Sequence, residues 1–275
     1  MPELPEVETV KESLRKRLLK KRIMEATIYY DNLIAYPDVA SFKKEIKGQT
    51  INELDRRGKF IIFVLDDYYL LSHLRMEGKY FFKNSKDILS KHEHLVFKLD
   101  DDIELRYHDT RKFGKMYLIK KEDINKIGPL KDLGLEPFSL ELTSSYLKEK
   151  LRNKNLPIKS ILLDQSIITG IGNIYADEIL FLSKINPLKK GKDLSTDELD
   201  KIILNTRKTL KEAITKGGTT IHSYASVDGI TGKFQNELLV HTKENTPCIN
   251  CQSNIEKIKI GGRSTYFCPN CQKMK

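Results

Sequence analysis

Apolar residues recur at helical spacing in the first stretch of the chain. One face of a helix would collect Leu4, Val7, Val10, Leu14 and Leu18. This spacing predicts a buried amphipathic helix over residues 1–20. We expect Pro5 at the first helical position, where its missing N–H costs nothing.

From about residue 22 to residue 118 the pattern changes to short runs rich in β-branched and aromatic residues. The clearest runs are residues 60–65, 69–73, 95–99 and 103–107. Acidic pairs and triplets between them predict hairpin turns. Regular short strands of this kind predict a sandwich or a barrel.

Glycines and prolines then interrupt the pattern and predict a linker around residues 128–143. Beyond the linker, helical spacing returns over residues 144–153, 158–163, 174–182 and 196–216. Ser195 provides a capped start for the last of these helices. A polar loop follows Gly217 and Gly218 and continues to Gln235.

All four cysteines lie near the end of the chain, at Cys248, Cys251, Cys268 and Cys271. Two C-x2-C pairs with sixteen residues between them are typical of a four-thiolate zinc site. Two disulfides are the alternative, but the chain has no signal-peptide pattern that would send it to an oxidising compartment. We therefore predict one structural Zn²⁺, which would stiffen a finger too small to fold alone.

The chain has a formal net charge of +10 and a pI of about 9.2. This balance favours a polyanionic partner, and nucleic acid before membrane because no long apolar run is present. Many soluble surfaces are highly charged without such a partner. We expect a cytoplasmic monomer.

The N-terminus carries candidate chemistry. Removal of Met1 would leave Pro2 with a secondary amine, and an α-amino group loses its proton more readily than a lysine. Such an amine is a nucleophile for carbonyl-like carbons and gives a cationic iminium. Glu3 and Glu6 follow closely. The alternative is an ordinary helix with acids in its first turn, where the helix dipole favours them.

Two loops combine basic and apolar residues, one at Met76 and one at Arg111 and Phe113. An enzyme that acts on a base must remove it from the duplex and fill the gap. An exposed Met76 could hold that gap open, Arg111 could contact the orphaned partner base and Phe113 could wedge between bases. A core methionine is the alternative for Met76. Lys59 directly precedes the apolar strand predicted at residues 60–65. It could bind a phosphate group, or it could serve only to keep the surface soluble.

Two further segments suit phosphate. The turn Thr169-Gly-Ile-Gly-Asn173 enters a predicted helix, which Asn173 could cap and whose first N–H groups could bind an anion. Residues 257–266 predict a β-hairpin with two glycines at its turn, and Arg263 near the tip could fork onto phosphate oxygens. A structural ribbon with an exposed arginine is the alternative.

These motifs together resemble the bacterial formamidopyrimidine-DNA glycosylases of the formamidopyrimidine-glycosylase/endonuclease VIII family. The resemblance rests on Met1-Pro-Glu-Leu-Pro-Glu-Val-Glu-Thr-Val10, on the runs at 56–59, 109–114 and 163–173, and on the cysteine-rich tail. Thr110 and Lys112 differ from the common family pattern.

The resemblance implies an α+β fold. An N-terminal β-sandwich flanked by helices (residues 1–137) would be joined by a linker to a helix–two-turns–helix domain (138–235) with a C-terminal zinc-finger hairpin (236–275).

The implied activity is that of a bifunctional DNA glycosylase and abasic-site lyase. It would excise oxidised purines such as 8-oxoguanine and formamidopyrimidines from duplex DNA through a Schiff base on the N-terminal proline, followed by β,δ-elimination. The implied catalytic residues are Pro2, Glu3, Lys59 and Arg263. The partner would be damaged double-stranded DNA at the bacterial nucleoid.

The resemblance also implies DNA contacts. They would come from His73, His92, Met76, Arg111, Phe113, Lys159 and Asn173. Lesion contacts are expected from Glu77, Thr219, Thr220 and Tyr224. His222-Ser223 stands where relatives often show Arg-Asp or a similar pair, which could shift preference among oxidised purines.

Two alternatives remain open at this point. An endonuclease VIII-type enzyme would excise oxidised pyrimidines, but Leu4 at the third residue of the processed chain favours the purine branch. A non-catalytic zinc-finger DNA-binding protein would keep the scaffold without the chemistry. Activity on a lesion-bearing duplex would separate them.

Overall fold

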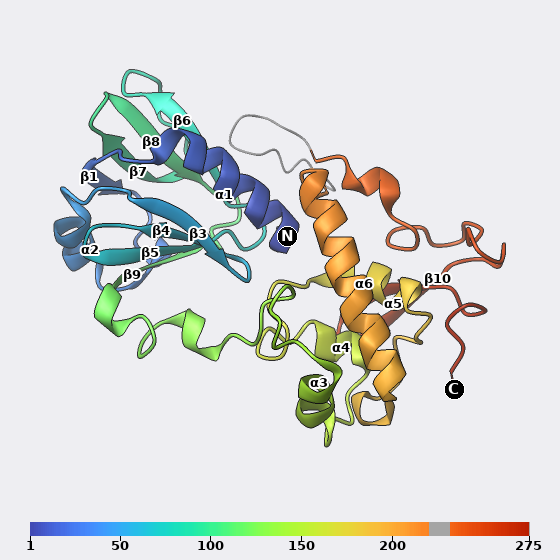
Figure 1. Ribbon diagram of the computed structural model, residues 1–275. Helices are drawn as coiled ribbons and strands as arrows, with labels where there is room; N and C mark the ends of the chain where they lie inside the picture. The colour runs from blue at the N-terminus through green and yellow to red at the C-terminus, as the bar shows by residue number, and fades with distance from the viewer. Residues whose placement is uncertain (220–231, 275) are drawn as a thin grey trace. The chain divides into compact units, whose positions relative to one another are not determined.

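The computed structural model describes residues 1–219 and 232–274. It divides into two compact units, one of Met1–Asp132 with Gly217–Gly232, the other of Leu133–Lys216 with Lys233–Lys275. The first unit holds two sheets and the second is mainly helical (Figure 1). The division after residue 132 falls inside the predicted linker.

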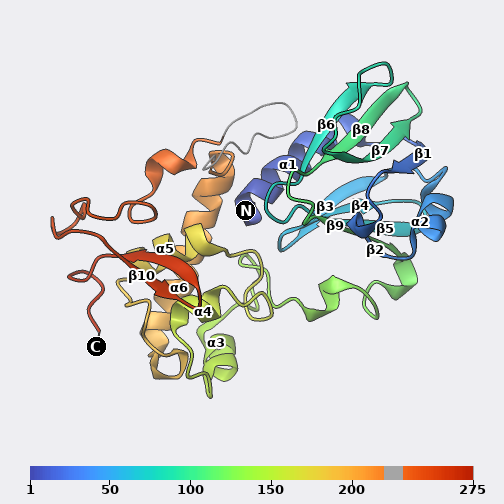
Figure 2. The ribbon, with the colours of Figure 1, turned by 180° about the vertical axis from the view of Figure 1, so that it is seen from behind.

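Two sheets lie against each other in the first unit (Figure 2). One has four antiparallel strands in the order β1 (Ile23–Ile28), β7 (Glu93–Leu99), β8 (Ile103–His108) and β6 (Lys79–Asn84). The other has the order β2 (Ile34–Tyr36), β9 (Lys115–Lys120), β5 (Tyr68–His73), β4 (Phe60–Val64) and β3 (Glu53–Arg57), with β2 parallel to β9. Apolar side chains from both sheets form one core.

Helix α1 (Leu4–Leu18) packs on β3 and β4 of this unit. The five apolar residues that predicted it are all buried, none more than 2 % exposed. The helix begins later than predicted, because Glu3 is its N-cap, and Pro5 therefore stands at the second helical position rather than the first.

Helix α2 (Val39–Ile46) interrupts the β-rich stretch and was not expected. Asp38 caps it by accepting a hydrogen bond from the Ser41 N–H at 3.0 Å. Phe42 and Ile46, four residues apart, are fully buried. A helix this short contains too few periods to be distinguished from neighbouring strands by spacing alone.

Among its described residues, the second unit contains four α-helices and a β-hairpin. They are α3 (Ser144–Leu151), α4 (Ile158–Leu162), α5 (Asn173–Leu182), α6 (Thr196–Thr215), β10 (Glu256–Ile260) and β11 (Arg263–Phe267). Helix α6 packs on α3 and α5, while α5 also contacts α4 and β11. Ser195 caps α6 together with Glu198, as predicted.

Short 3-10 helices connect these elements at η1 (Asp31–Leu33), η2 (Lys121–Asp123), η3 (Pro129–Asp132), η4 (Gly191–Asp193) and η5 (Phe234–Glu237). Arg207 of α6 fastens the end of the linker by donating to the carbonyl oxygens of Pro137, Ser139 and Leu142.

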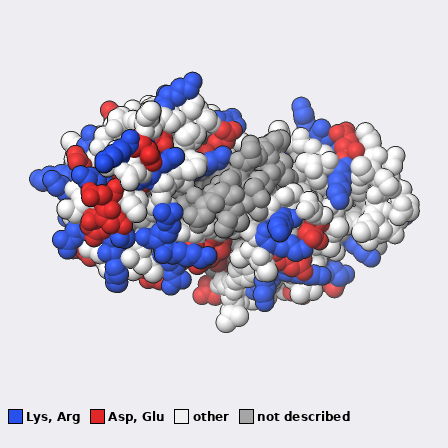
Figure 3. Space-filling view, turned by 90° about the horizontal axis from the view of Figure 1, so that it is seen from above, with Lys and Arg blue, Asp and Glu red and all other residues white. Residues whose placement is uncertain are grey.

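The predicted α+β class is confirmed, with sheets first, helices next and the cysteine-bearing hairpin last. No helix in the described part of the chain combines the length and apolar character that crossing a bilayer requires. Figure 3 shows lysine and arginine side chains interspersed with acidic ones on the face in view.

Candidate catalytic and nucleic-acid-binding residues

The residues that follow Met1 are buried in the first unit. Pro2 is buried, and Glu3 is 2 % exposed. With Met1 attached, the Pro2 nitrogen belongs to a peptide bond and has no lone pair for attack. Removal of Met1 would convert that atom to the α-amine of a buried N-terminal proline, one residue before the buried Glu3.

Glu6 organises this end of the chain. Its Oε2 accepts the Glu3 N–H at 2.8 Å, and its Oε1 accepts the Thr219 N–H at 2.7 Å and the Thr219 hydroxyl at 3.1 Å. Gly218 has φ +76°, and a Cβ there would lie only 2.6 Å from Glu6 Oε1. The buried Glu6 carboxylate is therefore hydrogen-bonded both to the N-terminal segment and to the start of the polar loop.

Sequence reasoning missed this role of Glu6. The local pattern shows only an acid in the first helical turn, and the partner Thr219 is 213 residues away in the chain. The one available signal was the Gly217-Gly218 pair, which permits the positive φ and the close approach.

Lys59 lies in the turn between β3 and β4 and is 6 % exposed. Gly58 before it has φ +58°. Arg56 supports the turn, since its Nη1 donates to the Gly58 carbonyl at 2.9 Å and its Nε to Glu8 Oε2 at 2.8 Å. The predicted position at the start of an apolar strand is thus observed, and the burial is greater than a solubilising lysine needs.

His73 ends β5 as a neutral ring. Its Nδ1 accepts the Arg75 N–H at 3.0 Å, which leaves the proton on Nε2. Burial, together with the positive charges of Arg75 and Lys59, lowers the pKa of His73 to about 3. Any phosphate contact from His73 would therefore be a neutral Nε2–H donor rather than an ion pair.

The loop after β8 is shaped by one carboxylate. Asp109, 1 % exposed, accepts the N–H groups of Arg111 at 2.9 Å, Phe113 at 3.0 Å and Gly114 at 2.8 Å. The ring of Phe113 is 49 % exposed, and the Arg111 guanidinium lies 4.9 Å from its centroid. The loop thus presents an arginine and an aromatic ring to solvent as a stacked pair.

Tyr107 brings this loop together with the loop that carries Met76. A Cβ on Gly78 would lie 2.1 Å from the Tyr107 hydroxyl oxygen, and one on Gly114 would lie 1.8 Å from it. Both backbones therefore pack directly on the same buried tyrosine. Met76 itself is half-buried, so the expectation of an exposed methionine was wrong.

Two further residues of the first unit, Glu77 and His92, were also predicted to contact DNA. Glu77 is exposed and accepts a hydrogen bond from the Thr110 hydroxyl. His92 is half-buried, with its ring centroid 5.5 Å from that of His108. Their proposed contacts with a base and with phosphate stay predictions.

Part of the predicted lesion-contacting loop cannot be placed. Thr220 and Tyr224, and the unusual His222-Ser223, lie outside the described residues. Thr219 is described and is 5 % exposed because it is engaged with Glu6.

In the second unit, Asn173 does not cap α5 as predicted. The N-cap is Gly172, and Asn173 is the first helical residue. Its Nδ2 instead donates to the Ser264 carbonyl of β11 at 2.8 Å. Since Arg263 precedes Ser264 and is exposed, the structure connects the start of α5 to the predicted phosphate-binding tip of the hairpin.

Lys159 is fully buried, at 0 % exposure. Its Nζ donates to Asp177 Oδ1 at 2.5 Å and to the Asn173 carbonyl at 2.8 Å. An ammonium group in this position has no access to a DNA phosphate, so the predicted contact is contradicted by its burial. Lys159 instead supports the helix start that carries Asn173.

Two acids of α5 hold the segment that leads to the hairpin. Asp177 Oδ2 lies 2.7 Å from His241 Nδ1. The Glu178 carboxylate accepts three backbone N–H groups, from Leu239, Val240 and His241, at 2.8, 3.0 and 2.9 Å. Burial raises the pKa of Glu178 while these hydrogen bonds oppose the rise. Neither acid had a sequence motif that predicted this role.

The four cysteines form a metal site. Their Sγ atoms all lie within 4.8 Å of one another, with 3.8 Å between Cys248 and Cys271 and 3.4 Å between Cys251 and Cys268. Tetrahedral zinc with Zn–S bonds of about 2.3 Å separates sulfur atoms by about 3.8 Å. All four cysteines are free of disulfides. The donor set therefore fits one structural Zn²⁺, as predicted.

Three family models match the chain in succession. They are the formamidopyrimidine-DNA glycosylase N-terminal domain at residues 1–116, the formamidopyrimidine-DNA glycosylase H2TH domain at 133–225, and the zinc finger found in FPG and IleRS at 246–273. The formamidopyrimidine-DNA glycosylase of Oceanobacillus iheyensis is 48 % identical over 100 % of this chain and 99 % of its own. That of Bacillus cereus is 44 % identical over 99 % of both chains.

Solved structures agree. A Lactococcus lactis FPG variant in complex with DNA containing Fapy-dG has a TM-score of 0.93, 40 % identity, and coverage of 99 % of this chain and 100 % of that one. The Lactococcus lactis Fpg with DNA containing an abasic site gives 0.92 at the same identity and coverage. The agreement in sequence, fold and cysteine site has one conclusion: the chain belongs to the formamidopyrimidine-DNA glycosylase family.

Proposed function

We propose that this protein excises oxidised purines, such as 8-oxoguanine and formamidopyrimidines, from duplex DNA and then cuts the strand at the resulting abasic site. The observation that carries the proposal is the buried Pro2-Glu3 pair at the start of α1, fastened by Glu6. Solved relatives bind DNA that contains Fapy-dG or an abasic site, which are the substrate and the intermediate of such a sequence.

The proposed chemistry begins once Met1 has been removed. The Pro2 amine attacks C1′ of the extruded nucleotide, and the bond from C1′ to the base breaks; the base leaves with the bonding electrons and takes up the proton that the Pro2 nitrogen releases. Glu3 donates a proton to the ring oxygen O4′ as the sugar opens, which leaves an iminium between Pro2 and C1′.

The iminium withdraws electrons and so acidifies C2′. Loss of a C2′ proton expels the 3′ phosphate, and a second elimination expels the 5′ phosphate. We assign Lys59 and Arg263 to contacts with the phosphates or the sugar of the substrate. His73, His92 and Asn173 would hold the phosphates on either side, and Met76, Arg111 and Phe113 would fill the space left by the extruded base. Because the substrate is chromosomal DNA, we place the reaction in the cytoplasm at the nucleoid.

An excision assay with a panel of duplexes tests the proposal. Each duplex carries 8-oxoguanine, a formamidopyrimidine, an oxidised pyrimidine or no lesion. We expect fastest excision of the two purine lesions and products cut on both sides of the lost nucleoside. Preference for oxidised pyrimidines would indicate endonuclease VIII-type function, and binding without excision would indicate a non-catalytic DNA-binding protein.

A further inference from the structure

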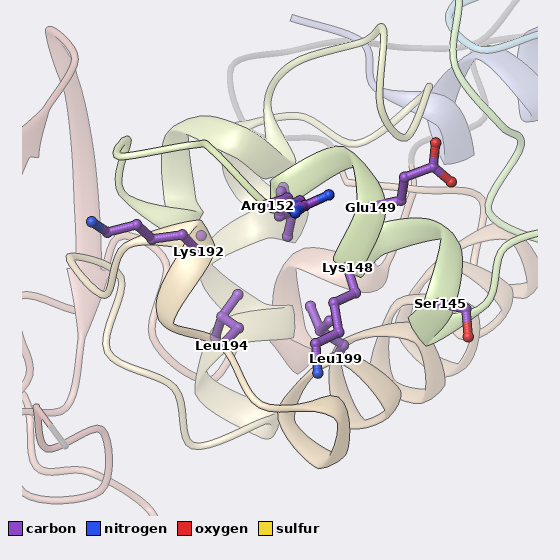
Figure 4. Close-up of a pocket in the computed structure, with 9 residues that line it drawn as sticks. Ser145, Lys148, Glu149, Arg152, Lys192, Leu194 and Leu199 are labelled. Atoms are coloured by element: carbon purple, nitrogen blue, oxygen red, sulfur yellow. The ribbon is translucent and has the colours of Figure 1, made fainter.

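A groove of about 490 Å³ lies in the second unit between α3, η4 and the start of α6 (Figure 4). The leucines that line it, Leu151, Leu194 and Leu199, are at most 5 % exposed, so the groove offers a ligand no apolar surface. In Figure 4 the side chains of Lys148 and Lys192 extend in different directions and do not converge on one anion. These side chains therefore do not form a ligand site.

In the first unit, two loops connect the four-stranded sheet with the five-stranded sheet. The β5–β6 loop (residues 74–78) leaves the five-stranded sheet and carries Met76. The β8–β9 loop (residues 109–114) returns to that sheet and carries Arg111 and Phe113. The three side chains proposed above to fill the space left by an extruded base therefore come from two separate connections, which must be held in a fixed relation to act together.

Strand pairing brings the ends of these two loops together. His73, which precedes the β5–β6 loop, is paired with Lys115, which follows the β8–β9 loop. In the other sheet, Lys79 after the first loop is paired with His108 before the second. The two loops are therefore anchored at neighbouring positions in both sheets.

Between these anchored ends, both loops rest on the hydroxyl group of Tyr107, which is 0 % exposed. Gly78 follows Met76 by two residues and Gly114 directly follows Phe113, and these are the two glycines whose added Cβ atoms would meet that hydroxyl oxygen. At Gly114 the three nearest atoms all belong to the tyrosine. Neither glycine has a φ in the left-handed region, so close approach rather than backbone conformation excludes a side chain there.

A second contact links the two loops at the surface. The Thr110 hydroxyl of the β8–β9 loop donates to the Glu77 carboxylate of the β5–β6 loop. Thr110 is adjacent to Arg111, and Glu77 is adjacent to Met76. The residues next to the proposed gap-filling side chains are therefore joined twice, by packing on a buried tyrosine and by an exposed hydrogen bond.

We propose that Tyr107 is a positioning residue that sets the spacing between Met76 in one loop and Arg111 and Phe113 in the other. The inference rests on the proposed function, in which these three side chains fill the space left by an extruded base. That space has the size of one nucleotide, so side chains from two loops enter it together only if their spacing is fixed. Tyr107 fixes it from a buried position, without touching DNA.

The first test is Tyr107→Phe, which removes only the hydroxyl group on which both loops rest. We expect excision of 8-oxoguanine from a duplex to slow by about tenfold, because a small misplacement of the gap-filling side chains has effects of that order. Cleavage at a preformed abasic site should change by less than about twofold, because that site has no base to unstack. The ratio of the two rates is the readout.

Tyr80→Phe is the matched control. Tyr80 is also buried, its ring packs edge-to-face on that of Tyr107 with 5.2 Å between centroids, and its hydroxyl donates to Ser72 Oγ at 2.7 Å. This variant should lose stability, because a buried hydrogen bond is removed, yet keep the ratio of the two rates. The control thus separates positioning of the loops from a general loss of stability.

A second test introduces the clash from the loop side. Gly114→Ala would place a Cβ 1.8 Å from the Tyr107 hydroxyl oxygen, so the β8–β9 loop must move and excision should slow more than in Tyr107→Phe. In Gly114→Ala/Tyr107→Phe the nearest ring atom is 2.8 Å away, so a smaller displacement is needed. The double variant should therefore excise faster than Gly114→Ala alone, as expected for two residues in direct contact. Thermal melting followed by circular dichroism confirms that each variant is folded.

Fluorescence of 2-aminopurine placed beside the lesion reports unstacking without any chemical step. A protein that unstacks the lesion but excises nothing would contradict the proposed function, and a smaller fluorescence change with Tyr107→Phe than with Tyr80→Phe would still support the positioning role. The positioning role is overturned if Tyr107→Phe keeps the rate ratio of the unaltered protein, or if removal of the hydroxyl gives Gly114→Ala no relief. A protein that neither unstacks nor excises the lesion would overturn both proposals.

Discussion

Glu6 is the residue on which the arrangement of the N-terminus depends most. It accepts hydrogen bonds from the backbone next to the proposed nucleophile and from Thr219, where the polar loop begins. Its side chain is buried, so each of these donors would lose its partner without replacement by water if the carboxylate were altered.

Glu6→Gln is therefore expected to slow base excision by about ten- to a hundredfold, because a small misplacement of reacting groups has effects of that size. The amide offers one acceptor atom where the carboxylate offers two, and turns an NH₂ group toward a donor. Single-turnover excision rates measure the effect, while affinity for lesion DNA should change much less. Glu12→Gln, on the same helix but half exposed, is the control; unchanged excision by the Glu6 variant would contradict the role.

His73 is expected to stay neutral at pH 5, since its pKa is lowered from 6.5 to about 3. NMR of the imidazole nitrogens should show an Nε2–H ring throughout. Between pH 6.5 and pH 3 the His73 ring binds a proton in the unfolded chain but not in the folded protein. The contribution of His73 to the free energy of unfolding is therefore fully present above pH 6.5. It decreases as pH falls toward 3, by up to about 1.4 kcal/mol per pH unit. A His73 ring that titrates near 6.5 in the folded protein would exclude this account.

At the level of elements, apolar spacing together with turn and capping residues predicted the local secondary structure. These signals predicted helix α1, strands β4, β5, β7 and β8, the capped helix α6 and the C-terminal hairpin. Two site predictions failed because a tertiary partner was stronger. Asn173 donates to Ser264 of the hairpin instead of capping α5, and Lys159, which the family resemblance implied as a DNA contact, pairs with Asp177 instead.

For the exposed loop that carries Phe113 we propose a role as a wedge. Phe113→Ala should slow excision of 8-oxoguanine from a duplex much more than it slows cleavage at a preformed abasic site. Extruding a stacked base costs a few kcal/mol (roughly), whereas an abasic site has no base to unstack. The ratio of the two rates measures this, and equal slowing on both substrates would argue against the wedge.

We expect the hairpin to depend on bound zinc. We expect one zinc per chain by elemental analysis, and Cys268→Ser should lose zinc and weaken DNA binding. The sheets of the first unit should remain folded, since their core contains none of the cysteines. Circular dichroism in the variant should therefore keep its β-sheet signal. Full DNA affinity in zinc-free protein would contradict the proposed part of Arg263 and the hairpin in DNA binding.

For the whole molecule, net charge predicted a polyanionic partner, cysteine spacing predicted the zinc site, and the family resemblance predicted the α+β fold. They could not predict contacts between residues far apart in the chain. Examples are Glu6 with Thr219, the packing of Gly78 and Gly114 on Tyr107, and the three N–H groups gathered by Glu178. Each depends on how distant elements pack, which local spacing does not encode.

The central claim is that the processed N-terminal proline is the nucleophile. The most direct measurement is to add borohydride during reaction with lesion DNA, isolate the reduced covalent adduct and map it by peptide mass spectrometry. We predict an adduct on Pro2 of the processed chain, and neither adduct nor excision by protein that retains Met1, although that protein should still bind the lesion. An adduct on Lys59 or another lysine, or full activity with Met1 in place, would contradict the account.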